Sequence, residues 1–197
     1  MDLEPDLFGV RPASVEHRTY FALFPSPAQS ARIEDGARRL GRRYNVHHVV
    51  HASRIHISLN GLKRGAELAP EQMQEALEVG AAVRRPAFDL LFDRIQSWDG
   101  GRSGGGRRLV PTVLCCSEPP REAAALYDDL RRVMQALGLH VGARTFNPHV
   151  TLWYAPTRLP PRNLARPLRF RVDRFCLAHT IVGSDRAEHL ASWPLKF

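Results

Sequence analysis

Two stretches of sequence decide how this chain folds, RIHISL at residues 54–59 and FNPHVTL at residues 146–152. Each contains a histidine, an apolar residue, a hydroxyl residue and a leucine, so that polar and apolar side chains alternate. Successive side chains of a β-strand point to opposite faces. The alternation therefore predicts two strands, at 54–62 and 147–154, each with an apolar face for the core and a polar face.

The polar face of each predicted strand carries one histidine and one hydroxyl residue. His56 and Ser58 share this face in the first strand, and His149 and Thr151 share it in the second. Residues i and i+2 lie about 7 Å apart along a strand, which suits an imidazole and a hydroxyl that hold different atoms of one phosphate. A single motif of this kind arises by chance. Two copies, each on a strand preceded by a helix, indicate two related lobes whose motifs meet.

The rest of the chain predicts an α/β or α+β protein with antiparallel hairpins. Ser26 and Pro27 begin a helix over 27–44, and further helices are expected over 70–84 and from Ser117 to Gly138. A glycine-rich loop is expected at 99–108, and residues 1–17 are expected to be a loosely ordered lead-in to one domain over 18–197. Further strands are expected at 18–24, 87–95, 109–116, 168–177 and 179–181.

Composition and charge limit the partners. The net charge is +8, and arginine supplies almost all of the basic residues, since Lys63 and Lys196 are the only lysines. This balance fits an anionic partner such as nucleic acid, and it also fits a GC-rich genome; both explanations stay open. No apolar stretch is long enough to span a bilayer, and the N-terminus does not resemble a signal peptide, so we expect no membrane association and a cytoplasmic location.

Neither a disulfide framework nor a metal site is expected. The three cysteines include no Cys-x-x-Cys pair, which favours reduced thiols. His47, His48, His51 and His56 are close in sequence, but no nearby cysteine or carboxylate completes a metal site. His179 is expected to be structural.

Two histidines and two hydroxyl groups match the needs of in-line phosphoryl transfer. One neutral histidine takes a proton from the attacking oxygen, and the other, protonated, gives a proton to the leaving oxygen. Imidazole suits both tasks because its pKa lies near neutrality. The hydroxyl groups of Ser58 and Thr151 donate hydrogen bonds to the non-bridging oxygens, where charge accumulates. This scheme needs no metal and no cofactor.

The two motifs, the opening strand RTYFALF at 18–24 and the closing segment 172–195 resemble the 2H phosphoesterases, most closely the RNA 2′,3′-cyclic phosphodiesterases, also called 2′-5′ RNA ligases. The resemblance covers roughly residues 18–197. It implies an α+β fold of two pseudo-symmetric lobes, each with an antiparallel sheet backed by helices, and an active-site cleft between the lobes.

The resemblance also implies an activity and roles for residues. The activity is the opening of a 2′,3′-cyclic phosphate at an RNA 3′ end to a 2′-phosphomonoester, with 2′-5′ ligation in some members. His56 and His149 match the catalytic histidines, and Ser58 and Thr151 match the phosphate-binding hydroxyls.

One departure from the family concerns the residues after the second motif. Many members carry an arginine there, whereas this chain has Trp153 and Tyr154. Tyr154 could donate a hydrogen bond and Trp153 could stack on a base. Phe24 and Phe146 are further candidates for base stacking, with core packing as the alternative for each.

Two functions are therefore expected in order of preference. The first is a metal-independent cyclic phosphodiesterase, expected to be a monomer, acting on RNA with a 2′,3′-cyclic phosphate end or on a small cyclic nucleotide. The second is a non-catalytic RNA- or nucleotide-binding module of the same fold. The intact histidine pair favours the enzyme, because a binding module has no need of two proton-transfer groups.

Overall fold

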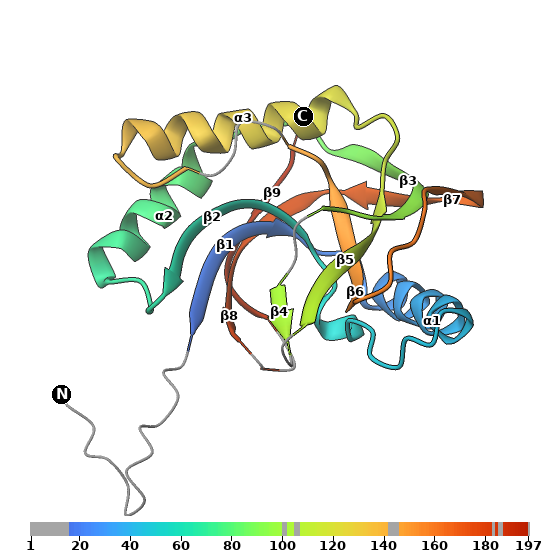
Figure 1. Ribbon diagram of the computed structural model, residues 1–197. Coiled ribbons are helices and arrows are strands. Elements are labelled where there is room, and N and C mark those ends of the chain that lie inside the picture. The colour runs from blue at the N-terminus through green and yellow to red at the C-terminus, as the bar shows by residue number, and fades with distance from the viewer. Residues whose placement is uncertain are drawn as a thin grey trace, which may run out of the picture.

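The computed structural model describes residues 16–99, 102–104, 107–141, 146–182, 184 and 187–196, with the backbone alone at 102–104 and 107. Within these residues the chain forms two antiparallel sheets and three α-helices, as the α+β prediction requires (Figure 1). Most of the lead-in expected at 1–17 lies outside the described residues. None of the described helices has the length and apolar character needed to cross a membrane.

The first sheet has the strand order β2-β1-β8-β9. Its strands are β1 (His17–Leu23), β2 (Ile57–Gly65), β8 (Arg174–Ile181) and β9 (Glu188–Pro194). In the second sheet, β5 lies between β6 and β3, and β7 pairs with the other side of β3. The short strand β4 pairs with the beginning of β5. Its strands are β3 (Phe88–Ser97), β4 (Arg102–Gly104), β5 (Arg107–Cys115), β6 (His149–Ala155) and β7 (Arg162–Val172).

Two helices pack against the sheet of the other half of the chain. Helix α1 (Pro27–Arg43) follows β1 but lies beside β6 of the second sheet, and α3 (Arg121–Ala136) follows β5 but contacts β2 of the first sheet as well as β3 of the second (Figure 1). Helix α2 (Pro70–Ala82) packs on β8 and β9. The units β1-α1-β2 and β5-α3-β6 thus correspond, and each motif strand, β2 or β6, lies beside the first strand of its unit.

A backbone hydrogen bond joins the two motif regions. The N–H of Val50, just before the first motif, donates to the carbonyl oxygen of Leu152 in β6 at 2.7 Å. The segment that leads into the first motif therefore lies along the free edge of β6 and hydrogen-bonds to it. This contact fixes the two histidine motifs relative to each other.

The sequence pattern misplaces several element boundaries. The strand expected from Arg54 begins only at Ile57, because Ala52–Arg54 form a short 3-10 helix in which the His51 ring accepts a hydrogen bond from the N–H of Ser53. Helix α3 begins at Arg121, with Pro120 as its N-cap, rather than at Ser117. The single strand expected at 168–177 is two strands that meet at Asp173, and β4 and β9 were not predicted.

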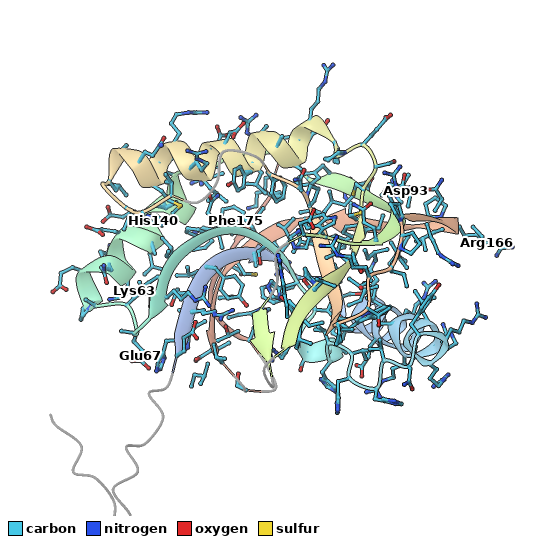
Figure 2. The ribbon with its side chains drawn as sticks, in the orientation of Figure 1. Lys63, Glu67, Asp93, His140, Arg166 and Phe175 are labelled. Atoms are coloured by element: carbon cyan, nitrogen blue, oxygen red, sulfur yellow. The ribbon has the colours of Figure 1, made fainter. Side chains whose placement is uncertain are left out.

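Apolar side chains from both sheets and all three helices form one continuous core, whose largest fully buried members include Phe21, Phe92, Trp153 and Phe175. Phe175 lies between the sheets and α3 in Figure 2. The Trp193 ring stacks on Phe175, at 5.2 Å between ring centroids, and lies against Gly80 of α2. The absence of a side chain at Gly80 is what admits this ring.

The substitution Gly80→Ala is expected to destabilise the fold, although alanine is the better helix former by about 1 kcal/mol. A Cβ at Gly80 would lie 2.3 Å from ring carbons of Trp193, so the ring or the helix has to move. We expect a loss of about 1–3 kcal/mol in the free energy of unfolding, measured by urea denaturation. Gly36→Ala in α1 is the matched control, since nothing lies within 4 Å of its Cβ position. Equal stabilisation by both substitutions would contradict the packing.

Candidate active site

The two motif histidines are held by the same local construction. The Nδ1–H of His56 donates to the carbonyl oxygen of Arg54 at 2.7 Å, and the Nδ1–H of His149 donates to the carbonyl oxygen of Asn147 at 2.8 Å. A carbonyl oxygen only accepts, so Nδ1 carries the proton in each neutral ring and Nε2 keeps its lone pair. Each half of the chain therefore presents one imidazole Nε2 as a proton acceptor or, once protonated, as a donor.

One cavity of about 250 Å³ brings both motifs together. His56 and Ser58 contribute from one side, and His149 and Thr151 from the other. The Oγ–H of Ser58 donates to the lone pair of His56 Nε2 at 3.0 Å, so this hydroxyl and the imidazole lie side by side in the cavity. The structure thus assembles all four residues that the sequence placed on the polar faces of its two motif strands.

The environment lowers the pKa of both histidines. For His56, burial is the largest cause, the Arg54 carbonyl opposes it, and the positive charges of His149 and Arg54 add to the lowering. For His149, burial lowers the pKa against the effect of the Asn147 carbonyl. The neutral form of each ring is therefore favoured, and a proton on one ring opposes a second proton on the other.

Two arginines line the same cavity, Arg18 of β1 and Arg54 of the 3-10 helix. Arg18 is held by Glu16, at 3.1 and 3.0 Å from Nε and Nη2. No carboxylate in the described part of the chain pairs with Arg54. These guanidinium groups supply the positive charge that the sequence lacks after the second motif. Arg54 could have been predicted, since it lies two positions before His56.

Tyr154, and not Trp153, lines the cavity. A regular strand would place Trp153 on the same face as His149 and Thr151. The register of β6 against β5 instead slips between Thr151 and Trp153, which pair with consecutive residues of β5. This β-bulge inverts the alternation beyond it. The proposed stacking of a base on Trp153 is therefore wrong, because its side chain is in the core, only 2% exposed.

The other aromatic candidates differ in position. The Phe24 ring lies 5.9 Å from that of His56, with centroids compared, and 4.1 Å from that of His189. Phe146 instead stacks on Tyr127 of α3, at 4.8 Å, and is not among the residues that line the cavity. This packing favours core packing, the alternative given for Phe146, and its contact with substrate stays a prediction.

Two aromatic neighbours of the histidines were not predicted. The Tyr20 ring lies 5.1 Å from the ring of His56, and the Trp98 ring lies 4.4 Å from that of His149. The position of Tyr20 beside His56 could be predicted from the alternation of side chains in β1, but only once β1 is known to pair with β2. Trp98 carries no signal in the sequence, because it comes from the end of β3, which is not adjacent to β6.

The cleft extends from the histidines along the first sheet. A cavity of about 370 Å³ shares His56, Ser58, Arg18 and Arg54 with the histidine cavity and continues over Tyr20 and Thr180. Beyond Phe24 a larger hollow of about 620 Å³ is lined by Arg171, Arg174 and His189 among others. The histidine cavity therefore continues along the first sheet, and a second hollow, lined by two arginines and by Asp173, lies on the other side of Phe24.

Comparisons with known proteins find solved structures of similar fold. The crystal structure of E. coli LigT complexed with 3′-AMP has 21% sequence identity and a TM-score of 0.70, covering 92% of this chain and 99% of that one. The protein TT0787 of Thermus thermophilus has 18% identity and a TM-score of 0.68, covering 91% of this chain and 98% of that one. A structure described as a phosphoesterase matches with 21% identity, a TM-score of 0.70 and coverage of 92% and 99%. No curated protein matches this chain in sequence.

The likeness of these structures shows a shared two-lobed fold. A family model described as the 2′-5′ RNA ligase superfamily matches residues 17–183, a range that contains both histidine motifs and all the strands except β9. The chain therefore belongs to the 2′-5′ RNA ligase superfamily of 2H phosphoesterases.

Proposed function

We propose that this protein hydrolyses the 2′,3′-cyclic phosphate at RNA 3′ ends to a 2′-phosphomonoester, by acid–base catalysis between His56 and His149. The observation that carries the proposal is the matched pair of imidazoles, each with Nδ1 fixed by a carbonyl and both lining one cavity. A module that only binds RNA has no use for this duplicated proton-transfer geometry.

The chemistry requires one proton to be removed and one to be supplied. One neutral imidazole takes a proton from water as its oxygen attacks phosphorus, and the bond from phosphorus to O3′ breaks. The other imidazolium gives its proton to O3′, which leaves the phosphate on O2′. If the 5′-hydroxyl of a second RNA attacks in place of water, the same steps form a 2′-5′ linkage.

The remaining polar groups of the cavity fit the charge of this substrate. The Ser58 and Thr151 hydroxyls line the cavity and would donate hydrogen bonds to non-bridging oxygens, and Arg54 offers a cation without a carboxylate partner among the described residues. E. coli LigT has been crystallised with 3′-AMP, with ATP and with NADP+, which supports a nucleotide as the ligand of the corresponding groove here.

The substitution Arg54→Gln is expected to weaken substrate binding about 10- to 150-fold, since a charge-assisted hydrogen bond contributes about 1.5–3 kcal/mol. The effect should appear in KM. The slope of log KM against log salt concentration should fall by about 1, the value expected for the loss of one phosphate contact. Steady-state assays at several salt concentrations measure both quantities. Arg39→Gln, on the exposed face of α1, is the matched control. Equal effects of the two substitutions would mean that Arg54 acts only through the overall charge of the protein and not through a contact with the substrate.

The pH dependence of kcat/KM is expected to be bell-shaped, with its maximum below about pH 6.5, the ordinary pKa of imidazole. Burial lowers the pKa of both histidines. A lower pKa keeps the base neutral down to a lower pH. It also makes the acid lose its proton at a lower pH. Both the acidic and the basic limb of the pH profile therefore move to lower pH. A maximum above about pH 7.5 would contradict this environment.

A further inference from the structure

Three side chains at one end of the first sheet direct metal-binding atoms at one another. Nδ1 of His17, in β1, lies 2.9 Å from Nε2 of His179, in β8, and 3.4 Å from Oε1 of Glu67, in the connection between β2 and α2. All three donor atoms lie within 4.8 Å of one another. We propose that His17, His179 and Glu67 bind a divalent transition-metal ion of the Zn²⁺ type.

This cluster is separate from the catalytic cavity. Strands β1 and β8 pair so that Arg18 lies opposite Thr180 and Thr19 opposite His179. Arg18 and Thr180 line the catalytic groove. Side chains alternate along both strands, so His17 and His179 belong to the opposite face. Figure 2 shows Glu67 beside the beginning of β1, at the edge of the molecule.

The donor spacing suits a four-coordinate ion. Zn–N bonds of about 2.0–2.1 Å in a tetrahedron place neighbouring donor atoms about 3.3 Å apart. The spacings of 2.9 and 3.4 Å from Nδ1 of His17 bracket this value, and the remaining pair, His179 and Glu67, has donor atoms within 4.8 Å, so rotation of the exposed Glu67 side chain toward His179 completes the set of three donors. Without it, one imidazole donates its N–H to the other, and binding of the metal releases that proton. Water completes the coordination.

A fourth residue supports one ligand from outside. Nδ1 of His179, the nitrogen directed away from His17, lies 3.6 Å from a carboxylate oxygen of Glu188 at the start of β9. A carboxylate beside the second ring nitrogen orients a ligating histidine and makes it a better donor. Glu188 is therefore close enough to take the role of the carboxylate that supports a ligating histidine in protein zinc sites, after a shift of its exposed side chain toward Nδ1.

The charges also distinguish this cluster from an ordinary surface ion pair. The chain has 28 Lys and Arg residues, yet among the described residues Glu67 and Glu188 approach only histidines and no lysine or arginine. Two imidazole nitrogens with a carboxylate oxygen favour zinc over Mg²⁺ or Ca²⁺, which take all-oxygen sites. A bound ion would tie β1, β8 and the β2–α2 connection together, which predicts a stabilising role apart from catalysis.

The test is titration of the full-length, tag-free protein with ZnCl₂ by calorimetry, together with melting curves. We expect one site per chain and a rise of about 5 °C or more in melting temperature at saturating zinc, reversed by EDTA. Mg²⁺ should give no rise. His17→Gln and His179→Gln should each weaken zinc binding at least about 100-fold. Co²⁺ should give the visible absorption of a tetrahedral site in the wild type and lose it in both variants.

Matched controls separate this site from other zinc-binding groups. Glu67 is 72% exposed, so Glu67→Gln is expected to fold normally and still weaken binding about tenfold or more, whereas Glu71→Gln on the first turn of α2 should leave it unchanged. His149→Ala should keep the zinc site while it removes a catalytic imidazole. Zinc binding that survives His17→Gln and His179→Gln, or that disappears in His149→Ala, would overturn the proposal. So would the absence of any zinc-dependent shift in melting temperature.

Discussion

Replacing either His56 or His149 with alanine is expected to lower kcat/KM for a 2′,3′-cyclic phosphate substrate by about 10³-fold, the middle of the range for general acid–base catalysis. Each imidazole presents Nε2 to the same cavity, and no other histidine is among the described residues lining that cavity. The loss should lie mainly in kcat, because proton transfer is needed in the transition state rather than for binding. Single-turnover assays on a cyclic-phosphate-ended RNA measure it.

The double variant tests whether the two histidines act together as one catalytic unit. Two groups that act as one unit are not additive, so His56→Ala/His149→Ala should be scarcely slower than either single variant. His48→Ala, at an exposed position of the chain that leads into the first motif, should keep full activity. Turnover that survives in both single variants would contradict the catalytic assignment. Unchanged RNA binding in that case would favour the second hypothesis, a binding module.

Trp153→Ala is expected to destabilise the protein by about 3–5 kcal/mol, the usual cost of removing a large buried aromatic side chain. Trp153 is among the largest fully buried side chains, and the bulge in β6 directs it into the core between the sheet and its helices. This loss is a large fraction of the stability of a typical domain. Urea denaturation followed by fluorescence or circular dichroism measures it.

The neighbouring residue provides the contrast. Tyr154→Phe keeps the ring and removes only the hydroxyl from the catalytic cavity. We expect it to change the free energy of unfolding little and to raise KM for the RNA substrate by several-fold, the value of one neutral hydrogen bond. If Trp153→Ala were stable and impaired substrate binding instead, the alternation of a regular strand would be right and the bulge wrong.

The catalytic histidines could be predicted because their signal is local. The i, i+2 spacing of His56 and Ser58, repeated by His149 and Thr151, follows from strand geometry, and their duplication indicated the two lobes. The strand boundary at Ile57 was missed, since the short helix before it has no composition that separates it from a strand. Even so, Arg54 lies in the cavity as alternation would place it.

The rest of the site depends on contacts between distant parts of the chain. The bulge that exchanges Trp153 for Tyr154 is a register slip against β5, and nothing in the residues of β6 encodes it. Trp98 reaches His149 from the far end of β3. The packing of α1 and α3 against the sheet of the other half is equally hidden, because an amphipathic helix specifies an apolar face without specifying which sheet covers it.

The most direct test of the proposed function is to incubate the protein, with EDTA present, with an RNA that ends in a 2′,3′-cyclic phosphate and to identify the product. We expect a 2′-phosphomonoester, because the imidazolium protonates O3′ as the leaving oxygen, and we expect turnover in the presence of the chelator. A 3′-phosphomonoester would contradict the assigned leaving oxygen. An RNA that is bound but recovered intact would contradict the enzyme altogether.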